Sequence, residues 1–372
     1  MNNRNLININ PKVLSWARTE MGTELVDMAF LLDIDHRIYN LWETDGKDVP
    51  FTKLKEISKL FKRQISCFFL PRAPKSVKKP KDHRNLKSCA ENLSKDTLLA
   101  IRNTCRYQEL LLNLNTQSYY ETKYKWLSDF HKEFEDRSNI GNELIANWIR
   151  KRIGLSLEKQ TKCRDPYGAY KLWRNLIEEN LGISIFQFKM PIDEIQGFCY
   201  GEEFPYCITV NSVHSAPTGK IFTILHELAH IIKHQSSICY PDRISESQKL
   251  EFECNSFAGK VLMPKESIVP TFNSDDIYKK ARKLNVSSEA YLRRMHSLKI
   301  VSDKDFFILL EEIRSKVKTK KGFAIISQLQ KSMNSRGNHL FNTVVDAAKG
   351  NKISYSNASD VLGIKINHFV NL

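Results

Sequence analysis

KIFTILHELAHIIKH, residues 220–234, contains His226, Glu227 and His230 in the pattern His-Glu-x-x-His. On a helix, residues four apart lie on the same face, so the two histidines can bind one cation from successive turns. Glu227 can reach a water bound to that cation without being a ligand itself. This is the arrangement of zinc proteases, in which two imidazoles hold the ion and the carboxylate accepts a proton from water.

Apolar residues surround these three side chains on nearly every side of the expected helix. They are Ile221, Phe222, Ile224, Leu225, Leu228, Ala229, Ile231 and Ile232, a pattern that indicates a helix buried in a domain core. Burying ionisable groups there without partners would cost roughly 2–7 kcal/mol for each group, and a metal ion removes that cost. The alternative is a surface helix that carries two histidines by chance, because short motifs also match without function.

A second helix downstream is expected to supply the third metal ligand. Residues 250–262 have apolar side chains at helical spacing. We interpret Glu251 as the ligand, and Asn255, one turn later, as an outer partner that fixes a histidine ring. Glu253 is the competitor, interpreted as a solvated charge. Cys254 could be a thiolate ligand, but a buried core cysteine is the favoured interpretation.

These two stretches resemble a known family. FTILHELAHIIKH followed by EFECNSFAGKVLMP is similar to the ImmA/IrrE-type metallopeptidases, cytoplasmic zinc enzymes whose third ligand lies in a Glu-x-x-Ala/Cys-Asn/Asp-x-Phe-Ala motif before a Met-Pro turn. The matching positions are Glu251, Cys254, Asn255, Phe257, Ala258, Met263 and Pro264. The resemblance implies one Zn²⁺ per chain and limited cleavage of a transcription regulator.

Length and composition narrow the class of protein. A chain of 372 residues with 41% hydrophobic and 10% aromatic residues has room for two or three folded domains and is not a disordered chain. It has no apolar run of membrane-spanning length and begins without a signal peptide, and its eight cysteines form no Cys-x-x-Cys pair. We therefore expect a cytoplasmic protein with reduced thiols and no membrane partner. The net charge of +15 favours contact with polyanions.

The first seventy residues predict a module of short helices around an apolar core. Helices are expected over residues 11–21, 25–32, 36–43 and about 54–61, with Tyr39 and Trp42 facing inward and Phe68 and Phe69 closing the core. Two short helices joined by a tight turn form a helix-turn-helix. The stretch resembles the Xre/Cro-type family, in particular the version fused ahead of ImmA/IrrE-type peptidases.

The docking geometry of that family assigns candidate DNA contacts. His36, Arg37 and Asn40 would face base edges, and Lys47 and Lys53 would contact phosphates. Three residues depart from the pattern: Asp33 holds the turn position where the family usually has glycine, and Asp35 and Glu43 bring negative charge near the expected DNA face. Some such modules only dimerise or bind proteins, and that alternative stays open.

The remaining chain completes a mainly α architecture with a small α+β zincin-like domain. Strands are expected over residues 183–188, 197–200 and 206–211, and an edge strand could hold an extended peptide. Ser215 and Pro217 give a start signal for the metal helix, and residues 353–372 read as a compact carboxy-terminal helix-turn-helix. The expected domains are 1–71 (helix-turn-helix), 72–92 (basic Pro/Lys-rich linker), 93–180 (helical connection), 181–270 (peptidase core) and 271–372 (helical region).

The sequence leaves three functional hypotheses. The first is a DNA-binding transcriptional regulator with a built-in zinc endopeptidase that cleaves a repressor, an antitoxin or itself, and a homodimer would suit paired DNA half-sites. The second is a non-catalytic transcription factor whose metal site senses a ligand. The third is the toxic component of a toxin–antitoxin or phage-defence pair. A donor to the oxyanion is also needed, and the candidates near in sequence are Tyr206, His214, His234 and Tyr240.

Overall fold

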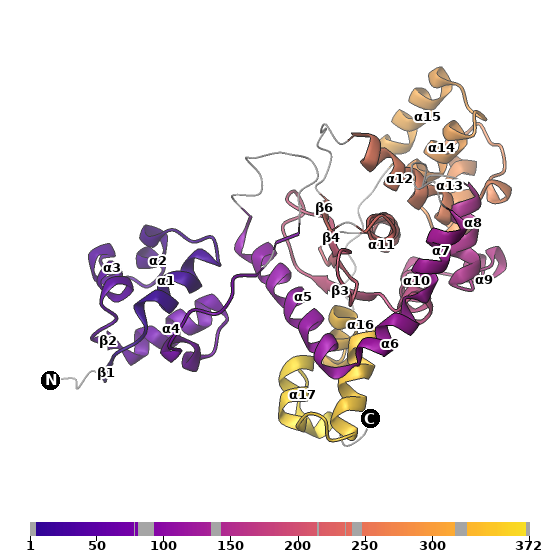
Figure 1. Ribbon diagram of the computed structural model, residues 1–372. Coiled ribbons are helices and arrows are strands. Elements are labelled where there is room, and N and C mark those ends of the chain that lie inside the picture. Colours follow the sequence, from indigo (N-terminus) through magenta and orange to yellow (C-terminus); the bar gives the residue numbers. More distant parts are fainter. Residues whose placement is uncertain are drawn as a thin grey trace. The chain divides into compact units, whose positions relative to one another are not determined.

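The computed structural model describes residues 5–77, 79–80, 93–134, 143–213, 216–234, 236–239, 248–316 and 326–369. The chain divides into an amino-terminal unit, residues 1–79 with 87–105, and a carboxy-terminal unit, residues 80–86 with 106–372 (Figure 1). Most of the predicted linker lies outside the described residues, and the finer domain boundaries stay predictions. Helices dominate both units and strands form small sheets, so the predicted mainly α fold with a small α+β part is confirmed. No helix within the described ranges combines the length and apolar character needed to cross a membrane.

The amino-terminal unit is a bundle of short helices closed by a small two-stranded sheet. Its elements are β1 (Leu6–Ile7), α1 (Pro11–Thr19), α2 (Leu25–Leu31), α3 (His36–Thr44), β2 (Val49–Pro50), α4 (Phe51–Phe61), a 3-10 turn (Ile65–Phe69) and the first part of α5 (Lys95–Leu114). Side chains cap the helices as expected of Asn and Asp: Asn10 accepts from the Lys12 amide and Asp35 from the Arg37 amide. The four predicted helices are confirmed.

The core of this unit agrees with the predicted pattern except at its end. Tyr39 and Trp42 are buried, and Phe68 is completely buried. The prediction for Phe69 is wrong: its side chain is 50% exposed, because a 3-10 turn directs consecutive residues to different sides. In the turn between α2 and α3, Asp33 adopts φ 52°, the left-handed conformation for which glycine is ordinarily used.

The carboxy-terminal unit surrounds a mixed sheet with helices. Its elements are α6 (Gln117–Lys123), α7 (Lys125–Glu133), α8 (Glu143–Arg152), α9 (Leu157–Thr161), α10 (Pro166–Leu181), β3 (Ser184–Phe188), β4 (Gly197–Tyr200), β5 (Cys207–Asn211), α11 (Pro217–Ile232), β6 (Ser237–Cys239), α12 (Gln248–Leu262), a 3-10 turn (Lys265–Ser267), α13 (Ser274–Leu284), α14 (Ser288–Ser297), α15 (Asp303–Ser315), α16 (Gln328–Lys349), α17 (Tyr355–Leu362) and a 3-10 turn (Ile366–His368).

The sheet has the strand order β3-β5-β4-β6. β3 is parallel to β5, and β4 is antiparallel to both β5 and β6. The three predicted strands are confirmed, whereas β6 was not predicted, because three residues are too few to show strand alternation. α11 packs against β4 and β5 and is seen end-on beside the strands in Figure 1. Pro217 opens α11 as expected, and Ser215 lies outside the described residues.

A glycine allows the close approach of α11 to the sheet. A Cβ atom on Gly197 would lie 2.6 Å from the Thr223 methyl group and 2.9 Å from the Thr209 carbonyl oxygen. Real Cβ atoms do not come that close, so any other residue would push α11 away from β4. The same position is 3.5 Å from a carboxylate oxygen of Glu227, so the inner strand β4 directly adjoins the His-Glu-x-x-His motif.

Buried side chains fix the end of α12. The last carbonyl groups of a helix have no partner within the helix; here Arg150 donates to Val261 (2.8 Å), Gln160 to Leu262 (3.0 Å) and Arg294 to Met263 (2.9 Å). Burial lowers the pKa of Arg150 to about 10, so its guanidinium stays charged at neutral pH. The predicted Met-Pro turn is therefore held by three separate helices.

The carboxy-terminal region closes the β3 side of the sheet. Arg174 donates to the Ile185 carbonyl, and Glu178 accepts from the Ile185 amide (3.1 Å) and from the Asn338 amide of α16 (2.9 Å). Gly337, with φ 78°, kinks α16 where a Cβ atom would meet Glu178. The predicted terminal helix-turn-helix is wrong in its second part, because α17 is followed by a short 3-10 turn in the described residues.

Candidate metal centre

Two helices bring three potential ligands together in the core. His226 and His230 come from α11 and Glu251 from α12, and their ligand atoms all lie within 4.8 Å of one another. The Nε2 atoms of the two histidines are 3.2 Å apart, and the Glu251 oxygens lie 3.3 Å from His226 Nε2 and 3.6 Å from His230 Nε2. Among the described residues, no other group of three or more such side chains meets this criterion.

The donor set fits a tetrahedral metal ion. Ligands about 2.0–2.2 Å from zinc at tetrahedral angles are about 3.3–3.6 Å apart, which matches the measured separations. The side chains are buried, with 7% exposure for His226, 0% for His230 and 13% for Glu251. Borderline nitrogen donors with one carboxylate suit Zn²⁺ better than Mg²⁺ or Ca²⁺, which prefer oxygen ligands.

Asn255 orients one of the histidine ligands. Its Oδ1 atom lies 2.9 Å from Nδ1 of His226. Because an amide oxygen only accepts hydrogen bonds, Nδ1 carries the proton and the lone pair of Nε2 points toward Glu251 and His230. Burial lowers the pKa of His226, but the carboxylates of Glu251 and Glu227 outweigh this effect and raise the pKa above its ordinary value. The site is therefore strongly attractive to a cation.

The competing ligands on α12 point elsewhere. Glu253 forms an ion pair with Lys233, and both side chains are largely buried, so it is neither a ligand nor the solvated charge that the sequence suggested. Cys254 is completely buried in the core, and desolvation raises the pKa of its thiol far above the ordinary value. A neutral thiol is a poor metal ligand. The structure thus brings Glu251, but neither of these residues, to the two histidines.

Glu227 has a partner that the sequence gave no reason to single out. The hydroxyl of Ser237 in β6 donates to Oε2 of Glu227 at 2.6 Å. The Cys199 sulfur of β4 lies 3.4 Å from the same hydroxyl oxygen, and burial together with Glu227 raises the pKa of this thiol well above its ordinary value. Ser237 lies outside both motifs, and only the pairing of β4 with β6 brings it to the site.

Two of the four candidate oxyanion donors, Tyr206 and His234, are described, and each contacts a residue that is not a proposed metal ligand. Tyr206 is buried in an aromatic cluster with Tyr124, with ring centroids 4.5 Å apart. His234 follows α11 with φ 52°, and its Nε2 lies 3.1 Å from Nε2 of His131 on α7. His214 and Tyr240 lie outside the described residues.

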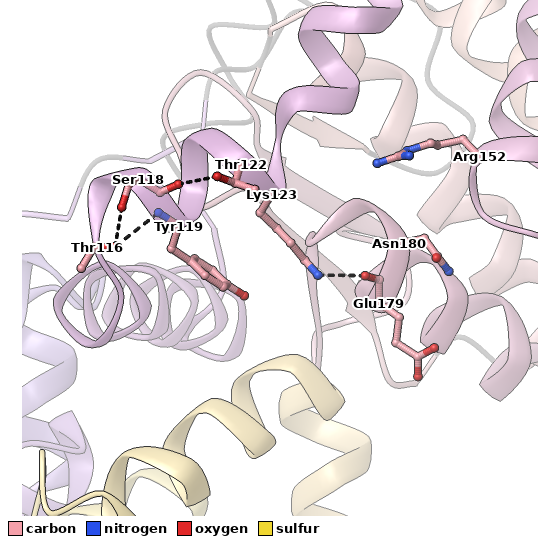
Figure 2. A pocket seen from close by; sticks show the side chains of 8 residues that line it. All are labelled: Thr116, Ser118, Tyr119, Thr122, Lys123, Arg152, Glu179 and Asn180. Carbon is pink, nitrogen blue, oxygen red and sulfur yellow. Dashed lines mark hydrogen bonds between the residues drawn. The ribbon is translucent and has the colours of Figure 1, made fainter.

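A separate surface groove of about 650 Å³ lies between α6, α8 and the end of α10 (Figure 2). Lys123 crosses it and donates to the Glu179 carbonyl at 2.9 Å. None of the metal-site residues lines it; the lining residues are Thr116, Ser118, Tyr119, Thr122, Lys123, Arg152, Glu179 and Asn180. The groove is therefore distinct from the metal centre.

In the amino-terminal unit, α3 exposes three of the proposed DNA contacts. The side chains of His36 and Arg37 are 58% and 81% exposed, and Asn40 is exposed on the same helix. Lys47 is exposed and pairs with Asp45 at 3.1 Å. Lys53 instead donates to the Leu32 carbonyl at 2.6 Å, so it satisfies a carbonyl group at the carboxy-terminal end of α2.

The acidic residues of this unit have different roles from those suggested by the sequence. Glu43 forms a two-bond ion pair with Arg18, at 2.8 and 3.0 Å, and so does not face outward. Asp35 caps α3. Even so, residues 24–48 contain seven acidic side chains and two basic ones, a formal charge of −5 (2 − 7). Apart from Asp27 in α2, the exposed acidic residues of this segment lie in the turns beside α2 and α3, and they are Glu24, Asp33, Asp35, Asp45 and Asp48.

Comparison with known proteins supports one part of this picture. No curated protein and no solved structure matches the chain significantly. Residues 178–296, from the end of α10 through α14, match the family Peptidase_M78, described as the IrrE N-terminal-like domain. This stretch contains the sheet, α11 and α12, and it supports an ImmA/IrrE-type, metallopeptidase-like domain in this part of the chain.

Proposed function

We propose that the carboxy-terminal unit is a zinc-dependent endopeptidase of the His-Glu-x-x-His plus glutamate class. The observation that carries the proposal is the meeting of His226, His230 and Glu251 at tetrahedral donor distances in a buried site. When bound, Zn²⁺ supplies a Lewis acid that lowers the pKa of water from about 15.7 toward 7.

The chain's own residues carry the proton transfer. Glu227, one residue after His226 and held by Ser237, is the proposed general base that accepts a proton and returns it to the leaving amine. Asn255 holds His226 in the tautomer that ligation requires. Apolar packing around α11 keeps bulk water away from these groups, which strengthens their electrostatic interactions.

The proposed substrate is a regulatory protein of the cytoplasm, such as a repressor or an antitoxin, cleaved at one or a few positions. The resemblance of the two motifs to ImmA/IrrE-type enzymes supports this class. At Ile185, the backbone groups of β3 are bonded to side chains, whereas β6 forms the opposite edge and adjoins Glu227. An extended substrate is therefore proposed to pair on the β6 side.

The test combines metal content with a search for new protein termini. Purified protein should contain one zinc per chain, and His226→Ala should abolish it. Cells that express the Glu227→Gln variant should lack the new termini produced by the wild-type protein, although this variant keeps its metal. If Glu227→Gln leaves all biological output unchanged, the non-catalytic sensor is the correct reading instead.

DNA binding is a second candidate function, for the amino-terminal unit. It is favoured by the exposure of His36, Arg37 and Asn40 on α3 of a helix-turn-helix. The exposed acidic residues in the turns beside α2 and α3 and the 85% exposure of Phe30 favour a protein partner at the same surface. A homodimer would present two such surfaces to either partner.

A further inference from the structure

The strand after the metal helix contacts the general base. β6 pairs with β4 in antiparallel register, with Ser237 opposite Cys199. Ser237 is 1% exposed and Glu227 is 0% exposed. The 2.6 Å distance between Ser237 Oγ and Glu227 Oε2 is typical of a hydroxyl that donates to a carboxylate. A residue remote from both motifs thus bonds directly to the glutamate of His-Glu-x-x-His.

The surrounding contacts fix the direction of that hydrogen bond. A serine hydroxyl has one hydrogen, and a carboxylate only accepts, so the Ser237 hydrogen points to Glu227. The Cys199 Sγ atom lies 3.4 Å from Ser237 Oγ, and the Cys199 thiol also has a hydrogen-bond interaction with Glu227. On the preceding residue, Ser236 Oγ accepts from the Gly201 amide at 3.2 Å. The serine pair therefore ties β6 to β4 on one side and to Glu227 on the other.

A glutamate needs such support to act as a base. Its side chain rotates about several bonds, and a carboxylate that is not held spends only part of its time in the reactive orientation. Groups in active sites are effective when neighbouring residues lock their rotamers. The backbone of Glu227 is part of α11, and Ser237 donates a hydrogen bond to the carboxylate at the end of its side chain.

We propose that Ser237 is a positioning residue that holds the Glu227 carboxylate in its working orientation beside the metal ligands. The inference rests on the proposed peptidase function and deepens it by adding a residue from β6 to the site. It also gives β6 a role, because this strand, paired with β4, brings the Ser237 hydroxyl to Glu227.

A ligand of known chemistry tests this without knowledge of the substrate. Acetohydroxamic acid loses a proton when it binds a metal ion through its two oxygens, and a carboxylate beside the ion accepts that proton. Its affinity therefore reports the orientation of Glu227. We would load the full-length protein with Co²⁺, titrate it with acetohydroxamate and follow the visible absorption. Metal content and the thermal midpoint of the metal-free protein are measured in parallel.

The variants are chosen to separate positioning from folding. Ser237→Ala should bind acetohydroxamate about tenfold more weakly, since a hydrogen bond to a charged group is lost, while it keeps one metal ion per chain. Ser237→Thr retains the hydroxyl and should restore most of the affinity. Ser236→Ala is the matched control: it removes the neighbouring buried hydroxyl, which bonds to Gly201, and should leave the affinity unchanged.

Each result decides between the inference and its alternatives. Wild-type affinity in Ser237→Ala, with a clear loss in Glu227→Gln, overturns the role of Ser237 but keeps the proposed function. Equal affinity in wild type and Glu227→Gln, or a wild-type protein that takes up no metal, overturns the proposed function itself. Tighter binding by Ser237→Ala would also overturn the role of Ser237, because the carboxylate, a stronger base without the serine donor, would then accept the proton without being held. Loss of the metal in Ser237→Ala, or an equal effect of Ser236→Ala, would reduce Ser237 to a structural residue.

Discussion

Lys233 and Glu253 form an ion pair that joins the end of α11 to the middle of α12. Both side chains are largely buried, at 14% and 13% exposure. Two residues earlier on α12, the Glu251 carboxylate instead lies beside the Nε2 atoms of His226 and His230. The two glutamates have the same side chain and lie two residues apart on α12, so only their partners distinguish the metal ligand from the residue that pairs with Lys233.

This difference predicts opposite effects of the same substitution. Glu251→Gln should lose the metal ion, because a neutral amide replaces the charged ligand. Glu253→Gln should retain one metal ion per chain and instead lower the free energy of unfolding by about 3 kcal/mol, because Lys233 is left buried without its counter-charge. Metal analysis and urea unfolding of the two variants check both parts. Retention of the metal in Glu251→Gln would contradict the ligand assignment.

Asn255 is expected to control metal affinity without touching the metal. Asn255→Ala removes the acceptor for His226 Nδ1, so the ring can rotate and change tautomer. Loss of such an outer partner weakens metal binding by about 10- to 100-fold. Competition with a chelator of known affinity measures the change, and an affinity within a factor of two of the wild type would show that the contact has no such role.

Gly197 and Gly259 offer a matched pair of glycine substitutions. Gly197→Ala should destabilise the protein by about 1–3 kcal/mol, since its Cβ atom would collide with Thr223 and Thr209. Gly259 lies inside α12 with no atom within 4 Å of an added Cβ, so Gly259→Ala should stabilise it by about 0.5–1 kcal/mol. Urea denaturation of both variants tests the pair; equal shifts in one direction would contradict the packing argument.

His339 should make stability depend on pH. Burial, assisted by Lys123, lowers its pKa from 6.5 to about 4, and the neutral ring lies 2.7 Å from Ser184 Oγ and 3.3 Å from Tyr119 Oη. Between these pKa values the unfolded chain binds more protons than the folded one. The contribution of His339 to the free energy of unfolding should therefore have its full value above pH 6.5. The free energy of unfolding should fall by up to about 3 kcal/mol as the pH decreases toward 4.

The histidine can be isolated from other groups that titrate in the same range. His339→Gln keeps hydrogen-bonding capacity but has no titration there, so its stability should fall less steeply between pH 6.5 and 4 than that of the wild type. Denaturant titrations at several pH values give both curves. Parallel curves would mean that His339 titrates normally in the folded protein.

The acidic turns beside α2 and α3 predict an unusual form of DNA binding. If this surface binds DNA, base contacts by Arg37 and Asn40 must supply most of the specificity. Because the surface offers few basic residues to phosphates, it should contribute little to the salt dependence of binding. The double change Arg37→Ala and Asn40→Ala should then remove sequence preference while leaving weak, salt-sensitive binding by the basic remainder of the chain. Fluorescence anisotropy with candidate operator and random duplexes distinguishes the two. Unchanged binding by the double variant would favour a protein partner.

Sequence spacing was sufficient to predict the positions of side chains that lie on the same helix. The interval of four residues between His226 and His230 places both side chains on one face of the helix. The apolar periodicity correctly predicted that Tyr39 and Trp42 are buried. It was insufficient where partners come from distant segments. The pairing of Lys233 with Glu253, of Arg18 with Glu43 and of Ser237 with Glu227 depends on tertiary packing, which no local pattern encodes. β6 was missed for the same reason, since its strand character arises from β4.

The closed side of the sheet also limits how the chain can be shortened. Glu178 uses one oxygen for the Ile185 amide and the other for the Asn338 amide of α16, so one carboxylate bonds both to β3 and to α16. A version that stops before residue 326 would keep every metal ligand yet expose the flank of β3. An uncovered strand invites pairing with other molecules, so such a fragment is expected to aggregate, and a fragment that keeps the metal site folded must retain α16.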